Sequence, residues 1–371
     1  MKERSWYELN SAKTSISPSL LVYPSRIAHN ITQMLQIAGG AARLRPHVKT
    51  YKMAEIIRMQ MEQGIKKFKC ATIAEAELLG ICKAADVLLA IQPVGPNIDR
   101  FMALQLAFPE TTFSTIVDEA HIALQLHDRA IKRNRKTAVY MDVDVGMHRT
   151  GIPTGTRGLE LYRKLCSLSH LEVRGFHVYD GHIRDSRLED RTKACNEAFE
   201  PVLEMKRHLE KEGMKVPVIV AGGSPTFPIH AGRTHDVETS PGTTLLWDAR
   251  YADDFTDMPF LPAAVLLSRI ISKPGDSLLC LDLGHKAVAP EMPFPRVQFL
   301  GLDDFEQLSQ SEEHLVLRTP SAHTYELGMP CYALPMHICP TVAKYPVVYI
   351  VESGEITDSW RIIARDHQLT I

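Results

Sequence analysis

The sequence predicts an α/β fold, a (β/α)8 TIM-like barrel followed by a β-rich C-terminal domain. Between about residues 40 and 245, eight short β-rich runs alternate with amphipathic, helix-like stretches. After about residue 255, strand-like runs follow one another through turn residues with little helix between them. Repeated strand–helix alternation is typical of a parallel barrel, and consecutive strands are typical of a separate β-rich domain.

The predicted barrel strands are short and separated by helix-like segments. In order, they are Arg43–Lys49, Lys67–Thr72, Asp86–Ile91, Phe113–Val117, Ala138–Val145, Val173–Tyr179, Val216–Gly223 and Asp236–Gly242. Two of the intervening stretches, Met53–Gly64 and Arg191–Gly213, have the pattern of amphipathic helices. The second stretch ends at a glycine, as many helices do.

The C-terminal part is predicted to begin near residue 251. Its strand-like runs are Ala263–Gly284, Arg296–Gly301, Glu313–Thr319, Tyr345–Ile356 and Trp360–Asp366. We therefore expect a barrel domain in residues 1–250 and a β-rich domain in residues 251–371. The early run Ser19–Pro24, followed by a helix from Ser25 to Gly39, could join either domain, so residues 1–24 could pack with the second one.

The composition is that of a globular protein, with 45% hydrophobic residues, 23% charged residues and a formal net charge of -2. This balance does not favour nucleic acid or an anionic membrane as a partner. The apolar runs are too short to span a bilayer, and the N-terminal MKERSWYELN lacks the apolar core of a signal peptide. Seven scattered cysteines favour a reduced, cytoplasmic protein over a disulfide framework.

The run RPHVKTYK carries the first candidate for chemistry. If it is a strand, Arg45, His47 and Lys49 share one face. A lysine that lies near other cations in a partly dry site has a lowered pKa and becomes an amine nucleophile, which is what a Schiff-base lysine requires. The alternative is a solvated lysine just beyond the end of the strand.

Two further segments carry candidate ligands. In VAGGSPTF, a predicted strand runs into a turn that offers backbone N–H groups and hydroxyls to a phosphate, although any tight turn can need glycine. In PMHICPT, His337 and Cys339 point the same way if the segment is extended, and an imidazole with a thiolate favours zinc. The alternative for this pair is a buried cysteine beside a structural histidine.

The chain resembles the D-threonine aldolase and D-serine dehydratase-like enzymes along nearly its whole length. These enzymes have an alanine racemase-type barrel and belong to the third fold type of pyridoxal-phosphate enzymes. The resemblance is carried by RPHVKTYK, by KCATIAEAELL and LLAIQPVGP, by DVDVGMHRTGI and GFHVYDGH, and by SPGTT and PMHICPT. Tyr51 departs from the usual histidine of the first motif, and AKYP after the last motif also departs from the best-known members.

The resemblance implies a role for each candidate residue. Lys49 carries pyridoxal 5'-phosphate as a Schiff base, Arg149 lies near the phenolic oxygen of the cofactor, and Tyr179 lies beside its ring. These three are the expected catalytic residues. The full set expected to bind the cofactor is Lys49, His47, Arg149, Tyr179, His182, Gly222, Gly223, Ser224, Thr226, Gly242 and Thr243. A divalent metal, zinc or alternatively manganese or magnesium, is expected on His337 and Cys339.

The same resemblance predicts a lyase that acts on a small D-β-hydroxy amino acid. Removal of the Cα proton followed by loss of the β-hydroxyl is the dehydratase outcome, and cleavage of Cα–Cβ is the aldolase outcome. In the family an aspartate at the second metal position accompanies aldolases and a cysteine accompanies dehydratases, so Cys339 favours β-elimination. An amino-acid racemase would leave the metal pair without a role, and a non-catalytic cofactor carrier would lack the β-rich domain. By resemblance we also expect a homodimer.

Overall fold

The computed structural model describes residues 5–234 and 236–371, and these form two compact units, each assembled from separate stretches of chain. The barrel unit contains residues 33–49, 56–242 and 366–371. The β-rich unit contains the described residues up to 32, residues 50–55 and residues 243–365. Of the early run whose placement the sequence left open, residues 1–4 lie outside the described residues.

Parallel strands form the centre of the barrel unit, as the strand–helix alternation predicts. Their order is β2 (Lys67–Cys70), β3 (Asp86–Leu89), β4 (Thr112–Val117), β5 (Thr137–Asp144), β7 (Leu171–Val178), β8 (Val218–Ala221) and β9 (Val237–Thr239), and the short β6 (Ile152–Pro153) pairs with β5. The strands therefore begin or end within a few residues of the predicted bounds, the usual precision at element ends.

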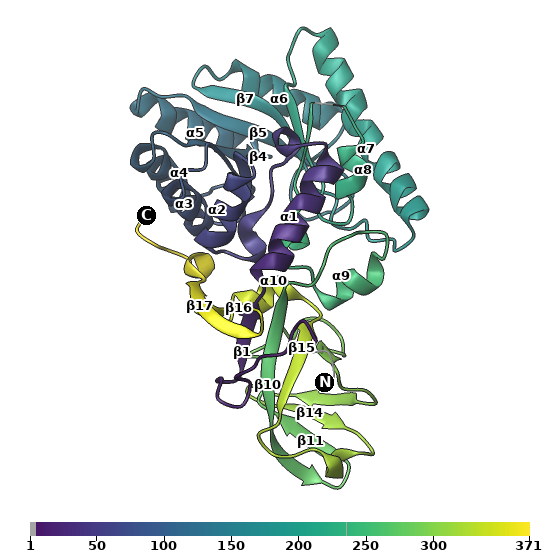
Figure 1. The fold of residues 1–371 in the computed structure, drawn as a ribbon. Coiled ribbons are helices and arrows are strands. Elements are labelled where there is room, and N and C mark those ends of the chain that lie inside the picture. Colours follow the sequence, from purple (N-terminus) through teal and green to yellow (C-terminus); the bar gives the residue numbers. More distant parts are fainter. Residues whose placement is uncertain (1–4, 235) are drawn as a thin grey trace. The chain divides into compact units, whose positions relative to one another are not determined.

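Helices connect these strands and lie along the outside of the sheet, where α3 to α6 follow one another side by side (Figure 1). Their bounds are α2 (Ala54–Glu62), α3 (Ile73–Ile81), α4 (Pro96–Ala107), α5 (Ala120–Lys132), α6 (Thr156–Ser167), α7 (Leu188–Lys211) and α8 (Phe227–Ala231). The amphipathic stretches Met53–Gly64 and Arg191–Gly213 thus correspond to α2 and α7. One face of α7, which includes Phe199, Val202 and Leu209, is buried, as expected of an amphipathic helix.

The prediction of a regular strand at Arg43–Lys49 is wrong. Leu44 forms an isolated parallel bridge with Thr239 of β9, and His47 forms another with Lys69 of β2. The segment therefore joins the two outermost strands of the sheet through isolated bridges. Pro46 explains the irregularity, because it has no N–H to donate, although its carbonyl accepts a 2.9 Å hydrogen bond from the backbone N–H of Lys69.

Arg45 lies at the end of the barrel where the strands begin. It is 1% exposed, its Nε donates to Glu238 over 2.8 Å, and its Nη1 donates to Asp86, the first residue of β3, over 2.7 Å. Lys67 also pairs with Glu238. The prediction that Arg45, His47 and Lys49 share one strand face is therefore wrong, because Arg45 pairs with two carboxylates and Lys49 lies in the short 3-10 helix η2 (Val48–Thr50).

The β-rich unit contains one sheet in which the N-terminal strand takes part. The strands are β1 (Ser19–Val22), β10 (Ala264–Gly275), β11 (Leu278–Leu281), β12 (Val297–Leu300), β13 (Glu306–Gln310), β14 (Leu315–Arg318), β15 (Pro330–Pro335), β16 (Val347–Glu352) and β17 (Glu355–Arg361). Strand β1 runs antiparallel to β10 and parallel to β16, which places the early run in this sheet. The same unit contains α9 (Ala249–Asp254) and α10 (Ile338–Val342), and α1 (Pro24–Ala38) follows β1.

The last residues of the chain return to the barrel unit. The carboxylate of Glu77 accepts hydrogen bonds from the backbone N–H of Thr370, over 3.0 Å, and of Ile371, over 3.1 Å. Arg100 donates to the carbonyl of Ile371 over 2.7 Å. These contacts attach the terminal segment to helices α3 and α4.

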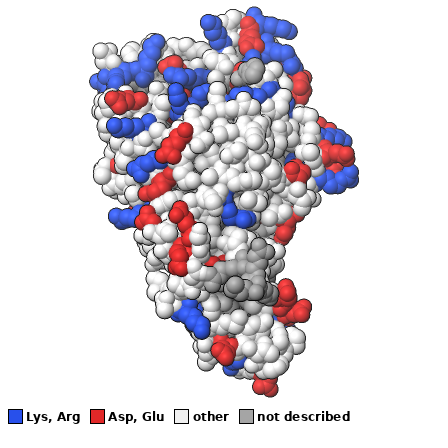
Figure 2. All heavy atoms as spheres, viewed as in Figure 1, with Lys and Arg blue, Asp and Glu red and all other residues white. Residues whose placement is uncertain are grey.

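Acidic and basic side chains are interspersed on the face of the molecule shown in Figure 2. This mixture agrees with the near balance of 42 basic and 44 acidic residues in the sequence. Among the described residues, every helix is too short or too polar to cross a membrane.

Candidate active site

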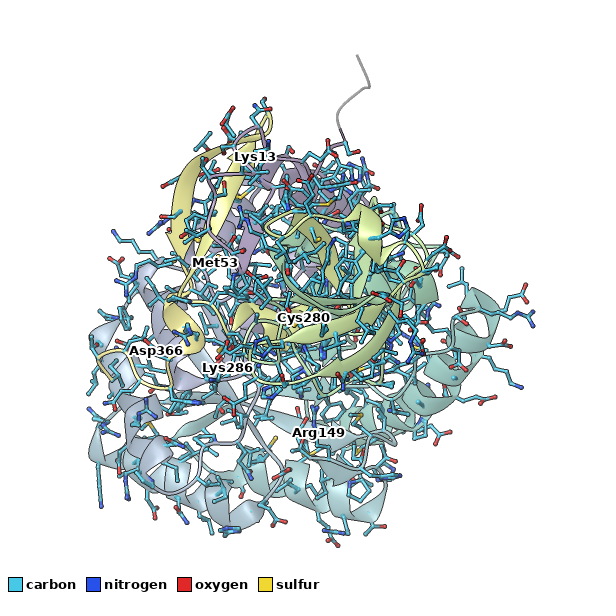
Figure 3. The ribbon with its side chains drawn as sticks, turned by 90° about the horizontal axis from the view of Figure 1, so that it is seen from below. Lys13, Met53, Arg149, Cys280, Lys286 and Asp366 are labelled. Atoms are coloured by element: carbon cyan, nitrogen blue, oxygen red, sulfur yellow. The ribbon has the colours of Figure 1, made fainter. Side chains whose placement is uncertain are left out.

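Three cationic side chains lie around the ring of Tyr179, which follows the C-terminal end of β7. The Nζ atoms of Lys49 and Lys69 lie 5.9 and 5.7 Å from the ring centroid, and the guanidinium carbon of Arg149 lies 4.9 Å from it. Arg149, labelled in Figure 3, comes from the loop between β5 and β6. Chemistry in parallel barrels gathers at this end of the strands. The structure thus brings together the three predicted catalytic residues, and Lys69 is a fourth member that the sequence reasoning missed.

Lys69 is nearly fully buried, with 2% of its surface exposed. Burial, and then the neighbouring charge of Lys49, lower its pKa to about 7. Lys69 stands between Phe68 and Cys70 in a four-residue strand whose last three residues are all buried. A lysine at such a position cannot extend into solvent as a surface lysine does.

A buried aspartate–histidine pair lies within the same barrel. Nδ1 of His177 lies 2.6 Å from Oδ1 of Asp142, and both side chains are at least nine-tenths buried. Burial would raise the pKa of Asp142, yet His177 holds it below its usual value, and burial lowers the pKa of His177. The pair is therefore a carboxylate and a neutral imidazole near pH 7. Among the described residues, Nε2 of His177 has no hydrogen-bond partner, so it offers a lone pair to a donor in the barrel.

The segment predicted to bind the phosphate, Gly222–Thr226, forms a tight turn after β8. Gly222 has a φ of +76°, and a Cβ atom there would lie 2.6 Å from the ring of His230. A Cβ atom on Gly223 would lie 3.1 Å from Cε2 of Tyr179. The backbone N–H of Gly242 donates to Oγ of Ser224 over 3.1 Å, which joins this turn to the one after β9. Glycine is therefore needed for both the backbone conformation and the close packing.

A buried hydrogen-bond network holds this turn in place. Thr226 accepts from the backbone N–H of Gly223 over 3.3 Å and donates to Oδ1 of Asp180 over 2.8 Å. The other oxygen of Asp180 lies 2.7 Å from Nε2 of His230. Burial would raise the pKa of Asp180, but the bond from His230 holds it below its usual value. Asp180, which directly follows Tyr179, thus couples the end of β7 to the glycine turn.

Among the described residues, one group of three histidine, cysteine or acidic side chains has ligand atoms close enough together to hold a metal ion. It consists of Asp180, Cys195 and His230. The hydrogen bonds argue against a metal there. Arg233 donates to Nδ1 of His230 over 3.1 Å, so Nε2 carries the proton that points at Asp180. Burial also raises the pKa of Cys195 to about 12, which leaves a neutral thiol.

The remaining predicted cofactor residues have less defined surroundings. His47 is almost buried, and its backbone N–H donates to the carbonyl of Pro241 over 2.8 Å. His182 is exposed, and its ring lies 3.1 Å from where a Cβ atom on Gly146 would be. Thr243 belongs to the β-rich unit, where its hydroxyl lies 3.7 Å from the Sγ atom of Cys339. Their assignment to the cofactor stays a prediction.

The predicted metal pair lies in the β-rich unit, although the expected extended segment is wrong. His337 is the residue before helix α10, and Cys339 is the second residue within it. The two side chains nevertheless interact. Burial would lower the pKa of His337, but its contacts with Cys339 and with Glu291 raise it. Helix geometry therefore keeps the two ligand atoms together where a strand was expected to do so.

Glu291 holds the imidazole of His337 in place. Its Oε1 lies 2.6 Å from Nδ1, which leaves Nε2 as the nitrogen that faces the thiol. The hydroxyl of Thr50 lies 3.2 Å from Sγ of Cys339. A carboxylate on the far nitrogen of a histidine is the usual arrangement around a metal-bound imidazole. The donor set, one nitrogen and one sulfur, therefore fits a zinc-type ion.

The barrel residues fit an anionic, aromatic aldehyde such as pyridoxal phosphate. Lysine amines can react with the aldehyde, a tyrosine ring can pack against the aromatic face, and a glycine turn can bind the phosphate. Among the described residues, the buried Nε2 of His177 has no hydrogen-bond partner, which also indicates that this part of the barrel suits a polar ligand. Sequence comparison agrees with this fit.

The chain matches two family models along most of its length. The alanine racemase N-terminal domain matches residues 22–249, and the putative serine dehydratase domain matches residues 263–351. A relative, D-threonine aldolase from Arthrobacter sp., is 26% identical over 326 residues, which cover 87% of this chain and 85% of that protein.

Solved structures share the fold over both units. The crystal structure of D-threonine aldolase from Filomicrobium marinum covers 98% of this chain and 99% of its own, with a TM-score of 0.84 and 21% identity. A cysteine-to-alanine mutant of D-threo-3-hydroxyaspartate dehydratase, solved in its metal-free form, covers 96% of this chain and 99% of its own, with a TM-score of 0.77 and 21% identity. The chain therefore belongs to the alanine racemase N-terminal domain family, within the group of pyridoxal-phosphate-dependent lyases that contains the aldolases and dehydratases.

Proposed function

We propose that this protein is a pyridoxal-phosphate- and metal-dependent lyase that removes water from a small D-β-hydroxy amino acid such as D-serine or D-threonine. The observation that carries the proposal is the convergence of Lys49, Arg149 and Tyr179 at the C-terminal end of the barrel strands. A homodimer and a cytoplasmic location remain predictions from the sequence.

In this proposal Lys49 holds the aldehyde carbon of the cofactor through Nζ. In the same proposal the turn of Gly222, Gly223, Ser224 and Thr226, with Gly242, lies around the phosphate. The N–H groups of Gly223 and Gly242, which donate over 3.3 and 3.1 Å to hydroxyls of this turn, would exchange those bonds for bonds to the phosphate. When bound, pyridoxal phosphate supplies an electron sink for charge that develops at Cα of the amino acid.

The residues of the chain move the protons. The amine of Lys49, once released by the amino group of the substrate, is placed to take the proton from Cα. Tyr179 would cover the aromatic face of the cofactor and keep water away from it, and Arg149 places a positive charge beside the ring of Tyr179. Asp142 holds His177 in the tautomer whose Nε2 accepts a hydrogen bond.

A divalent metal would be held by Nε2 of His337 and Sγ of Cys339, and the nitrogen–sulfur donor pair favours zinc over manganese or magnesium. Such an ion supplies Lewis-acid stabilisation of a leaving hydroxyl oxygen. The thiolate at Cys339 is our reason for placing dehydration first, because the resemblance associates cysteine at this position with dehydratases.

A D-threonine aldolase is the second candidate. It is favoured by the Arthrobacter relative, which bears that name and matches 87% of this chain. The aldolase would deprotonate the β-hydroxyl first and release glycine and an aldehyde. A racemase is disfavoured because it gives the His337–Cys339 pair no role.

The deciding experiment incubates the protein with pyridoxal phosphate, zinc and D-threonine and identifies the products by mass spectrometry. We expect 2-oxobutanoate and ammonia, and we expect both to disappear after chelation. Glycine with acetaldehyde would show an aldolase instead. L-allo-Threonine, the Cα epimer of D-threonine, detected by chiral chromatography without either product pair, would show a racemase.

A second measurement tests the cofactor itself. Borohydride reduction after loading should fix the pyridoxyl group to Lys49, as read by peptide mass spectrometry. The variant Lys49→Ala should lose the label, whereas the matched variant Lys67→Ala, which changes a lysine paired with Glu238, should keep it. A label on another lysine, or no label, would refute the proposed role of Lys49.

A further inference from the structure

We infer that Thr50 supports the proposed metal site by donating a hydrogen bond from its hydroxyl to the metal-bound sulfur of Cys339. Thr50 acts through that sulfur and is therefore a positioning residue. The inference rests on the proposed function, because it assumes that Cys339 binds a divalent metal as a thiolate.

The side chain of Thr50 is buried beside the sulfur. Thr50 is the last residue of the short helix η2, where it directly follows Lys49, and it is fully buried. Its Oγ1 lies 3.2 Å from Sγ of Cys339. Both residues belong to the β-rich unit, so the contact lies within one compact unit. A buried hydroxyl needs a hydrogen-bond partner, and the sulfur is placed to be that partner.

Metal binding decides which of the two atoms donates. In the protein without an ion, either the thiol of Cys339 or the hydroxyl of Thr50 can be the donor. When a divalent metal binds, a metal–sulfur bond forms and the thiol proton is released to solvent, so the sulfur can only accept. The hydroxyl is then the donor. Because a hydrogen bond to a charged acceptor is stronger than one between neutral groups, this contact favours the metal-bound state.

Other groups at the sulfur differ from Thr50 in distance or in role. The hydroxyl of Thr243 lies 3.7 Å from Sγ of Cys339, further away than the hydroxyl of Thr50. The imidazole of His337 also interacts with Cys339, and Glu291 holds that imidazole in place. Glu291 and Thr50 therefore each support one metal ligand. The carboxylate orients the nitrogen donor, and the hydroxyl stabilises the sulfur donor.

A hydrogen bond to the sulfur also changes the electronic character of the metal. It draws electron density from the thiolate, so the thiolate donates less to the ion, and the ion keeps a larger positive charge. A more positive ion is a stronger Lewis acid toward a hydroxyl oxygen, which is the role that the proposed dehydration gives to the metal. We therefore expect Thr50 to affect both the affinity for the metal and the metal–sulfur bond itself.

The test loads the protein with cobalt(II) or zinc and needs no substrate. A thiolate bound to cobalt(II) gives a sulfur-to-metal charge-transfer absorption whose wavelength depends on the electron density at the sulfur. Zinc affinity is measured by competition with a fluorescent chelator. We compare Thr50→Val, which removes the hydroxyl at nearly constant shape, with Thr50→Ser, which keeps it. Thr319→Val is the matched control, because Thr319 is also fully buried in the β-rich unit but its hydroxyl contacts Ser321.

We expect Thr50→Val to move the charge-transfer absorption to longer wavelength and to weaken zinc binding about tenfold or more, the usual effect of removing a group that supports a metal ligand. Thr50→Ser and Thr319→Val should keep the wild-type wavelength and affinity. An unchanged wavelength in Thr50→Val would overturn the inference, even if zinc binding were weaker. So would equal shifts in Thr50→Val and Thr50→Ser, because such shifts would not depend on the hydroxyl.

Failure of this inference differs from failure of the proposed function. If the wild type gives no charge-transfer absorption with cobalt(II), Cys339 is not a metal ligand, and the metal site of the proposed function fails together with the inference. If the absorption is present, is lost in Cys339→Ser and is insensitive to Thr50, only the inference fails.

A measurement on the wild type decides the matter should Thr50→Val not fold, as judged by circular dichroism. The protein is loaded with a spin one-half isotope of cadmium, which also binds thiolates, and is studied by proton NMR. A hydroxyl proton of Thr50 that is coupled to the cadmium through the sulfur supports the inference. The absence of that coupling overturns it.

Discussion

Nδ1 of His337 and Oε1 of Glu291 lie 2.6 Å apart, and this contact determines which nitrogen of the imidazole faces Cys339. With Nδ1 bound to the carboxylate, Nε2 is left as the donor to a metal. Glu291 comes from the segment between β11 and β12, far in sequence from helix α10. The metal pair therefore depends on a residue outside its own motif.

Replacing Glu291 with Ala should weaken zinc binding by about 10- to 100-fold, the usual effect of removing a carboxylate behind a metal-bound histidine. Competition with a fluorescent chelator measures this affinity without any substrate. Glu291→Gln should fall in between, because the amide can still orient the ring. Glu313→Ala, which removes an exposed partner of Lys286, is the control and should bind zinc normally. Equal affinities for all the variants would refute the role of Glu291.

Gly222→Ala should damage the phosphate turn by more than backbone strain alone. Gly222 and Gly213 both have positive φ values, +76° and +82°, but only at Gly222 does a Cβ atom meet neighbours within 4 Å. Gly213→Ala should therefore cost about 1 kcal/mol of stability. Gly222→Ala should cost more and weaken binding of pyridoxal phosphate, as measured by urea unfolding and by cofactor absorbance. Equal effects of the two substitutions would show that contact with His230 is unimportant.

Asp180→Asn should destabilise the protein by about 3–5 kcal/mol near neutral pH, because it removes the charge from a buried hydrogen-bonded network. The pKa of Asp180 is lowered in the folded state, so its contribution is fully present above the unfolded value of about 3.9. That contribution is lost as the pH falls through the folded pKa. The gap in unfolding free energy between wild type and variant should thus shrink below about pH 4.

Urea unfolding at several pH values checks the prediction for Asp180. Asp185→Asn changes an exposed carboxylate five residues away and serves as the control, with little expected effect on stability. A gap for Asp180→Asn that stays constant down to acid pH would contradict the proposed origin of the stabilisation.

Glu238→Ala should destabilise the barrel and leave cofactor chemistry intact. It would leave Arg45 with Asp86 alone and Lys67 without a carboxylate, at the end of the barrel where the strands begin. We expect a loss of about 3–5 kcal/mol, the typical cost of removing one partner of a buried ion pair. The variant, assayed below its melting temperature, should still capture pyridoxal phosphate on Lys49. Failure to do so would mean that this ion cluster also serves the catalytic end.

The sequence predicted the barrel because strand–helix alternation is a local pattern that each β–α pair repeats. It did not predict how the barrel closes. The segment around Pro46 is extended only where Leu44 and His47 meet β9 and β2, and those partners are distant in sequence. Strands β13 and β15 were also missed, since the polar run Glu306–Gln310 and the run Pro330–Pro335 have little β-type alternation of their own.

The candidate site was predicted where a motif carries the residue, as at Lys49, Arg149 and Tyr179. Lys69, Asp142 and Asp180 were missed because nothing local distinguishes a buried charge from an exposed one. Their importance depends on burial and on partners from other strands. His337 and Cys339 interact as their proximity in the sequence suggests, although Cys339 lies in a helix that begins just after His337, and their role as metal ligands stays a prediction.

The pairing of β1 with β10 and β16 has a consequence for synthesis of the chain. Strand β1 is made well before its two neighbours, which end at Gly275 and Glu352. On the ribosome, the parallel strands of the barrel emerge one after another and can pair while translation continues. The sheet that contains β1 must wait until Glu352, the last residue of β16, has been made. A nascent chain stalled at residue 250 would therefore expose β1 as an unpaired edge, and such edges are the places where chaperones or aggregation act.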